Sequence, residues 1–246
     1  KEDFCYLFVG HWMQGDHGHD RKNVGVLIKS FYDTFKTGMG KKPALILKSS
    51  MGVASYISRD SILDKIKRIK DTYGDVKLPN IYLISGEFDD SEMNELYNHP
   101  KVKAMVSFTK GEGFGRPLLE FATTGKPIIA SGWSGHTDFL KTDYNVLLPG
   151  RLENVHPSAA NDWLVKEAQW FQVDEKTAKS SLKQVYKHYK DYLNRSKKQK
   201  QYIKENFSWD KMKKLVNKNL ESNVPDLPVQ VPLNLSNIGL PKLNKI

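Results

Sequence analysis

A glycine-rich loop between an expected strand and an expected helix constrains this chain most. This glycine loop (residues 111–115) follows the apolar run 104–108, which has the length and composition of a buried strand. Residues 117–124 have a helical pattern, and Pro117 fits a first helical turn because the N–H that it lacks would have no partner there. Free N–H groups at a helix N-terminus bind anions. We therefore predict an anion-binding site where this strand ends.

Two carboxylates bracket the turn of this loop. Glu112 stands before Phe114, and Glu120 follows in the expected helix. Carboxylates accept hydrogen bonds from hydroxyl groups, so their place beside an anion site favours a ligand with hydroxyls next to phosphates. A nucleotide sugar is such a ligand. The alternative for either glutamate alone is a surface acid that binds nothing.

Apolar runs of strand length alternate with helical patterns through the first 150 residues. This alternation predicts an α/β fold with a doubly wound parallel sheet, covered on both faces. Such sheets bind ligands outside the carboxyl ends of their strands, where the glycine loop is expected. The expected strands are 4–9, 44–48, 80–85, 104–108, 127–131 and 145–148, and the expected helices are 21–35, 59–73, 91–98, 117–124 and 136–141.

The pattern changes after Gly150, which suggests a second part of the chain. Residues 151–173 have no clean period and are expected to form a long irregular segment. Three helices are expected next, over residues 175–193, 196–205 and 209–220. We predict a Rossmann-like nucleotide-sugar-binding domain over residues 1–150, a loop and packing helices over 151–223, and an extended tail over 224–246.

The charge balance is basic, with 38 Lys and Arg against 28 Asp and Glu and a formal net charge of +10. This balance fits an anionic ligand such as a nucleotide sugar, an anionic membrane surface or nucleic acid. The alternative is that the basic residues lie on solvated helix faces and bind nothing. No nucleic-acid module is recognisable, so we expect no nucleic-acid partner. The only cysteine, Cys5, lies in an apolar run, which favours a buried thiol in a reducing compartment. The sequence contains no apolar run of membrane-spanning length, so we predict a cytoplasmic protein, with peripheral membrane contact left open.

Residues 112–120, read Glu-Gly-Phe-Gly-Arg-Pro-Leu-Leu-Glu, and the following 125–131 resemble the donor-site signature of retaining glycosyltransferases with the GT-B fold, family 4 type. The resemblance extends from Tyr6 to Trp209 and matches only the C-terminal, donor-binding half of such enzymes. It implies one half of a GT-B fold, with an acceptor glycan, lipid or protein held by an N-terminal domain that is missing here. It therefore also implies that the isolated chain is inactive.

The resemblance assigns roles to residues of the glycine loop and of the helix after it. Glu120 would hold the ribose hydroxyls, and Glu112 would contact the transferred sugar. Amides of the loop would face the sugar and the diphosphate, and Arg116 would add charge or lie exposed. The implied donor-binding residues of this segment are Glu112, Gly113, Phe114, Gly115, Arg116, Leu118 and Glu120.

Basic residues after the first strand resemble the family's phosphate clamp. Lys22 would neutralise the diphosphate as the sugar leaves, so Lys22 and Glu112 are the implied catalytic residues. The family usually has Gly-Arg at the end of this strand, whereas this chain has His11 after Gly10. Either Arg21 substitutes for that arginine or the leaving group is stabilised less. Lys48 would face the diphosphate unless it is a plain sheet-edge lysine, and main-chain atoms near Phe88 would face the nucleobase.

Two further segments carry hypotheses of their own. Residues 11–20 contain His17, His19, Asp16 and Asp20, which invites a zinc site, but the glycine-rich setting provides no rigid ligand geometry. Residues 132–138 resemble the family's Gly-Gly segment only in part, with His136 and Asp138 as candidates there.

We therefore predict a donor site for a UDP- or GDP-type nucleotide sugar, with no cofactor and no required metal. The alternatives are a nucleotide-sugar-binding module without catalysis and a basic nucleic-acid-binding protein.

Overall fold

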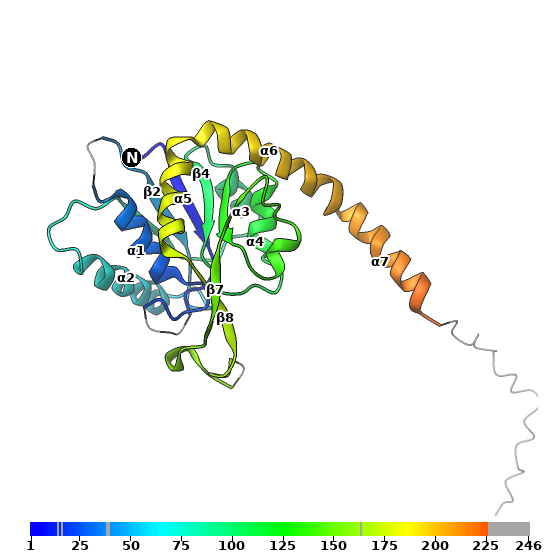
Figure 1. Cartoon of the computed structure of the whole chain (residues 1–246), viewed down its shortest axis with the longest axis horizontal. Coiled ribbons are helices and arrows are strands. Elements are labelled where there is room, and N and C mark those ends of the chain that lie inside the picture. Colours follow the sequence, from blue (N-terminus) through cyan, green and yellow to red (C-terminus); the bar gives the residue numbers. More distant parts are fainter. Residues whose placement is uncertain (14, 16, 38–39, 163, 226–246) are drawn as a thin grey trace, which may run out of the picture. The chain divides into compact units, whose positions relative to one another are not determined.

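Six parallel strands form the main sheet of the computed structural model (Figure 1). Their order in the sheet is β3-β2-β1-β4-β5-β6. The structure describes residues 1–13, 15, 17–37, 40–162 and 164–225. The predicted strands are confirmed, with small shifts at their ends. They are β1 (Cys5–Val9), β2 (Ala44–Lys48), β3 (Ile81–Ile84), β4 (Val102–Ser107), β5 (Ile128–Ser131) and β6 (Val146–Leu148).

Helices cover both faces of this sheet, as the doubly wound prediction requires. One apolar core joins β1 to α1 (Val24–Phe35), α2 (Tyr56–Asp71) and α5 (Glu175–Lys187). The core on the other face joins the same strand to α3 (Asp90–Asn98), α4 (Arg116–Ala122) and α6 (Tyr189–Asn206). Successive residues of β1 serve opposite cores: Tyr6 and Phe8 pack in the first and Leu7 in the second, all fully buried. This alternation follows from the two-residue period of a strand.

The strand order reverses between β1 and β4, which are neighbours in the sheet. From β1 the chain continues outward to β2 and β3, and from β4 it continues outward in the opposite direction to β5 and β6. Parallel pairing aligns the carboxyl ends of these strands, with Val9 beside Lys48 at the end of β1 and β2. Open sheets bind ligands at such a switch point, outside the carboxyl ends. The glycine loop follows β4 and lies there.

Local capping explains where the helices begin. The predicted helix 21–35 begins only at Val24, because the Asp20 carboxylate accepts that residue's N–H at 3.2 Å and Asn23 adopts a left-handed φ of 56°. Arg21 and Lys22 therefore precede the helix. Helix α3 begins after a capping box in which Asp89 and Glu92 bond each other's backbone N–H groups.

Three predictions on secondary structure are wrong. Residues 151–173 are not irregular: β7 (Gly150–Asn154) pairs antiparallel with β8 (Gln169–Val173), with the 3-10 turn η2 (Pro157–Ala159) between them. The helix expected over 136–141 is the 3-10 turn η1 (Gly135–Asp138). The break between the last two helices of the sheet unit falls at His188 rather than after residue 193, since its φ of −113° and ψ of 36° leave the helical region.

Residues Lys1–Phe207 form one compact unit and Ser208–Ile246 a second, and each is described by itself. In the second unit, α7 (Trp209–Asn223) confirms the expected helix. The predicted tail lies almost wholly outside the described residues, and the three-part division of the chain stays a prediction. Among the described residues, no helix is both long and apolar enough to cross a membrane.

Candidate functional site

A cleft of about 700 Å³ opens at the carboxyl ends of β1 and β2. Its walls come from the segments that follow β1, β2 and β3, and from helices α3 and α4. Most of the predicted donor-site residues converge on it from separate parts of the chain. They are His11, Arg21, Lys22, Lys48, Phe88, Arg116 and Glu120.

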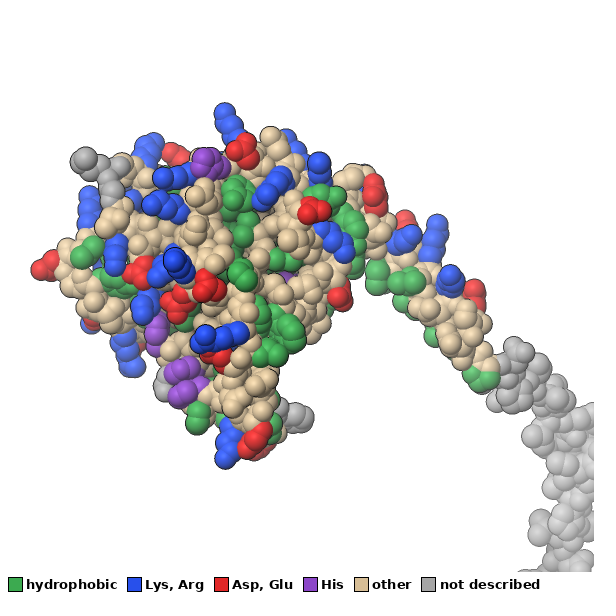
Figure 2. Space-filling model, in the orientation of Figure 1, with side chains coloured by type: hydrophobic (Ala, Val, Ile, Leu, Met, Phe, Trp, Pro, Cys, Tyr) green, Lys and Arg blue, Asp and Glu red, His purple; other side chains and the backbone are tan. Residues whose placement is uncertain are grey.

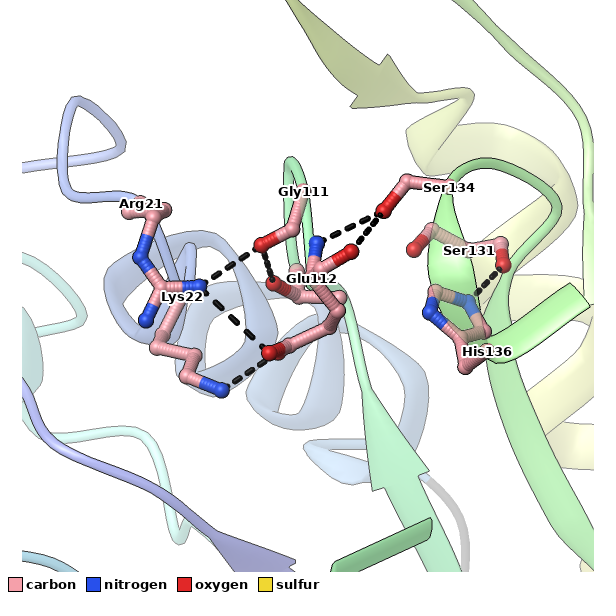
Figure 3. A network of polar contacts seen from close by, with 8 residues as sticks. Arg21, Lys22, Gly111, Glu112, Ser131, Ser134 and His136 are labelled. Carbon is pink, nitrogen blue, oxygen red and sulfur yellow. Dashed lines mark hydrogen bonds and ion pairs between the residues drawn. The ribbon is translucent and has the colours of Figure 1, made fainter. Parts of the chain in front are cut away.

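Lys22, Arg21 and Glu112 form an ion cluster beside this cleft (Figure 3). The Lys22 ammonium donates to the Glu112 carboxylate, and both side chains are only 11% exposed. The Arg21 guanidinium lies 3.5 Å from the same carboxylate and donates to the Gly111 carbonyl at 2.6 Å. The turn before α1 therefore holds the glycine loop through charge and through its backbone.

The ion cluster sets the protonation of Glu112. Burial alone would raise the pKa of this carboxyl, but the Lys22 ammonium and the Arg21 guanidinium outweigh burial and hold the pKa below its usual value. Burial lowers the pKa of the Lys22 ammonium, and the Glu112 carboxylate opposes that shift. At neutral pH the carboxylate is charged, so Lys22 already has an anionic partner.

Glu120 occupies a more open position on α4. Its carboxylate accepts a hydrogen bond from the Tyr97 hydroxyl at 3.1 Å and lies 3.1 Å from the Arg116 guanidinium, one helical turn away. The Glu120 side chain is 38% exposed. Burial and then the nearby carboxylate raise the pKa of Tyr97, so its hydroxyl remains a donor. Glu120 therefore faces the cleft with acceptor capacity left for a ligand's hydroxyls.

Lys48 and Phe88 meet where β2 and β3 end. The Lys48 ammonium donates to the Gly86 carbonyl at 2.5 Å and lies 4.6 Å from the centre of the Phe88 ring. Burial lowers the pKa of Lys48, and two nearby glutamates oppose the shift. His11 is exposed at the end of β1 and shares a 2.9 Å hydrogen bond with the Ser50 hydroxyl.

The remaining predicted residues belong to the loop and to the core rather than to the cleft lining. Gly113 and Phe114 are exposed, and the Phe114 ring packs 5.2 Å from that of Phe139. Gly115 caps α4 with a left-handed φ of 87°, a conformation that favours glycine. The Leu118 side chain lies in the core, and its N–H donates to the Gly115 carbonyl at 2.9 Å. Their roles as donor ligands stay predictions.

Sequence reasoning missed two residues that hold this site. Tyr97 lines the cleft and bonds Glu120, and Ser134 bonds the backbone of Glu112. Tyr97 lies on the inner face of α3, where an aromatic residue is expected as core, so its hydroxyl gave no signal. Ser134 lies in the segment that resembles the family only in part. That departure from the family pattern was the one sequence feature that could have pointed to this serine.

The loop after β1 borders a different cavity. This cavity, about 870 Å³, is lined by His17, His19 and residues of the β7–β8 hairpin. It is larger than the cleft, but most of the predicted donor residues line the cleft, which also lies at the switch point. Among the described residues no cluster of His, Cys, Asp and Glu could hold a metal ion. Asp16, part of the zinc hypothesis, lies outside the described residues.

Solved structures that match this fold include glycosyltransferases. HepE from Anabaena, in complex with UDP and glucose, matches with a TM-score of 0.60 at 10% identity, over 89% of this chain and 48% of HepE. Sucrose-phosphate synthase from Thermosynechococcus elongatus matches with a TM-score of 0.58 at 16% identity, over 89% of this chain and 46% of the synthase. The fold is that of glycosyltransferases.

One of these matches is a domain of similar size to this chain. The C-terminal domain of LpcC, a glycosyl transferase group 1 family protein from Francisella tularensis, matches with a TM-score of 0.54 at 14% identity. The match covers 83% of this chain and 86% of that domain, whereas the chain spans about half the length of HepE. The expected fold, one half of GT-B, is thus confirmed. No protein-family model and no curated protein matches the sequence.

Proposed function

We propose that this chain is the donor-binding part of a glycosyltransferase, which transfers a sugar from a UDP- or GDP-type donor with retention of configuration. The observation that carries the proposal is one cleft lined by Arg21, Lys22 and Lys48 and also by the Glu120 carboxylate. Cations suit a diphosphate and a carboxylate suits ribose hydroxyls. The cleft lies at the switch point of the sheet, where nucleotides bind in open α/β folds.

The cations provide the chemistry that sugar transfer needs. Negative charge grows on the diphosphate as the bond to the sugar breaks, and fixed positive groups stabilise that charge. Lys22 already lies against Glu112, so a bound diphosphate would share or take over this ammonium. Glu112 would then face the sugar. Retention is supported by the resemblance of residues 112–120 to retaining enzymes, and no side chain of this chain need act as a nucleophile.

The acceptor, a glycan, lipid or protein, would lie on a second wall of the cleft. The neighbours HepE and sucrose-phosphate synthase are each matched over less than half of their length, which supports a further domain in enzymes of this fold. The proposal needs neither a cofactor nor a metal, because lysine and arginine side chains supply the positive charge.

A nucleotide panel in EDTA tests the proposal. We expect one of UDP, GDP or ADP, or one of their sugars, to raise the melting temperature, and a concentration a hundred times the dissociation constant to stabilise the fold by about 2.7 kcal/mol. Lys22→Gln should lose most of this shift, whereas Lys41→Gln, on a side chain that is 90% exposed, should keep it. No shift with any nucleotide at millimolar concentration would show the proposal to be wrong.

A second candidate function is binding of the nucleotide sugar without catalysis. The same cleft favours it, because every group named above serves binding as well as transfer. Binding to nucleic acid gains less support: over α1 and α5, Figure 2 shows lysine and arginine side chains interspersed with acidic ones rather than in a basic stripe. DNA or RNA affinity that increases at low salt, together with no change in melting temperature on addition of nucleotides, would favour that alternative.

Contact with an anionic membrane surface stays a proposal, and helix α7 supports it. Trp209, Met212, Val216 and Leu220 recur along one face of this helix and are 37–81% exposed. Four lysines and two acidic residues share the rest of its surface (Figure 2). Such basic amphipathic helices lie on anionic bilayers. Co-sedimentation of the chain with phosphatidylserine vesicles, lost in Trp209→Ser, is the expected result. Equal recovery with neutral vesicles would contradict it.

A further inference from the structure

Ser134 has a backbone conformation that serine rarely adopts. Its φ of 79° and ψ of −169° fall in a region occupied almost only by glycine. Among the described residues other than glycine, only Asn23 shares a positive φ. Holding a residue there costs about 1–3 kcal/mol and persists only where surrounding contacts enforce it.

Those contacts run from Ser134 to the backbone of Glu112 (Figure 3). The Ser134 hydroxyl accepts the Glu112 N–H at 2.6 Å and donates to the Glu112 carbonyl at 2.7 Å. The N–H of Gly135 donates to the same carbonyl at 3.1 Å. One side chain thus satisfies both backbone groups of the glutamate that pairs with Lys22.

The two loops also approach each other closely. A Cβ atom added at Gly135 would lie 2.1 Å from the Gly113 carbonyl oxygen and 3.0 Å from that of Glu112. The loop after β5 therefore lies directly against the glycine loop, and the unusual conformation of Ser134 brings its hydroxyl into this contact. A glycine at 134 would adopt the same backbone without strain but would lack the hydroxyl.

We infer that Ser134 is a positioning residue, which fixes Glu112 so that its carboxylate faces the sugar of the bound donor. The inference rests on the proposed function and extends it to a residue outside the cleft lining. Lys22 and Arg21 hold the carboxylate of Glu112, and Ser134 holds its backbone. With both ends fixed, the carboxylate meets the sugar without a further loss of conformational freedom.

Two substitutions separate the strain from the hydrogen bonds. Ser134→Ala keeps the strained backbone and removes the hydroxyl, so we expect a lower melting temperature than in the parent chain. Ser134→Gly removes both, so its melting temperature should lie above that of Ser134→Ala. Ser131→Ala is the matched control. Ser131 is the last residue of β5, and its buried hydroxyl has no hydrogen-bond partner among the described residues.

Calorimetry with two ligands then tests the positioning role. We expect both Ser134 variants to bind the plain nucleoside diphosphate within about twofold of the parent, and to lose about tenfold in affinity for the corresponding nucleotide sugar. Ser131→Ala should match the parent with both ligands. A purely structural role would weaken both ligands equally or neither.

The possible failures are distinguishable. A parent chain that binds no nucleotide overturns the proposed function and this inference together. A parent chain that binds both ligands, with variants that show no difference between them, overturns only the role of Ser134. Because Ser134→Gly relieves strain, poor folding of Ser134→Ala would leave the test intact.

Discussion

The two glutamates of the candidate site differ in what already contacts their carboxylates. Glu112 is paired with two cations and is 11% exposed, whereas Glu120 is 38% exposed and contacts a tyrosine hydroxyl and an arginine. A ligand therefore meets a neutralised carboxylate at one position and an available acceptor at the other. This difference supports separate roles, with Glu120 on the ribose and Glu112 on the sugar.

Substitution of each glutamate should separate these roles. Glu120→Ala should weaken the nucleoside diphosphate and the nucleotide sugar alike, by about ten- to a hundredfold, because a charged hydrogen-bond partner of the ribose is lost. Glu112→Ala should weaken only the nucleotide sugar. It frees the Lys22 ammonium for the diphosphate, so affinity for the plain diphosphate should not fall. Calorimetry on both variants with both ligands provides the four affinities to compare.

Two outcomes of these affinity measurements would contradict the assigned roles. Equal losses for the two ligands in Glu112→Ala would remove its assignment to the sugar. Unchanged binding in Glu120→Ala would remove the ribose assignment. Glu95→Ala, on the exposed side of α3, serves as a control for a lost surface carboxylate.

The ion pair between Lys22 and Glu112 also predicts a dependence of stability on pH. A carboxyl whose pKa is lower in the folded state than its ordinary value of 4.5 stabilises the fold above that value. This contribution is lost as the pH falls through the folded-state pKa. We therefore expect the parent chain to be more stable than Glu112→Gln at pH 7, and the difference in unfolding free energy to shrink below about pH 4.5. Urea unfolding of both proteins at neutral and acid pH measures it, and a constant difference would contradict the assignment.

Sequence alone was informative about which charged residues belong to the site and less so about what holds them. Lys48 ends a strand, Lys22 precedes a helix and Glu120 lies in the helix that follows a strand, and topology brings such positions to one sheet edge. The Tyr97–Glu120 and Ser134–Glu112 bonds join residues from different elements. No local pattern encodes such pairs, because each depends on how neighbouring loops and helices pack.

At the scale of elements, the β7–β8 hairpin is the part that the sequence pattern did not predict. In β7 Leu152 is the one large apolar residue, and in β8 Trp170 and Phe171 are adjacent, so the period of two is weak. The hairpin nevertheless reaches the site. The Phe171 N–H donates to the Lys110 carbonyl at 2.9 Å, and the Trp170 ring lies 4.4 Å from the Lys110 ammonium. Lys110 directly precedes the glycine loop, so the hairpin supports the segment that carries Glu112.

Gly150→Ala should disrupt this support. A Cβ atom at that position would lie 2.1 Å from the Gln172 carbonyl oxygen and 2.7 Å from the Phe171 ring, so the two strands must move apart. We expect a loss of about 1–3 kcal/mol in unfolding free energy, as for other overpacked sites, and weaker binding of the nucleotide sugar. Gly74→Ala is the control, since nothing lies within 4 Å of its added Cβ and only its φ of 57° opposes the change. Equal donor affinity in the two variants would show that the hairpin does not support the site.

At the scale of the whole molecule, the order of the sheet follows from features visible in the sequence. Continuous apolar strands such as β1 and β4 predict burial on both faces, and the helices between them predict parallel crossovers. Fold and site location were therefore predictable, because both depend on periodicity and chain order. Helix ends and the break at His188 were not, since they depend on caps and on single backbone conformations.

If the chain provides only the donor wall of the proposed cleft, it should lack transferase activity by itself. The purified 246-residue chain should bind a nucleotide sugar but transfer no sugar from it. The residues that converge on the cleft suit the donor, and none has been assigned to the acceptor. An acceptor that is not held in place forfeits the advantage of orientation, which amounts to up to about 7–11 kcal/mol of the barrier. Release of diphosphate should therefore be no faster with acceptors than without them, and no faster than in Lys22→Gln, which controls for contaminating enzymes. Acceptor-dependent turnover by the parent chain, absent from the Lys22 variant, would show that these 246 residues form a complete active site.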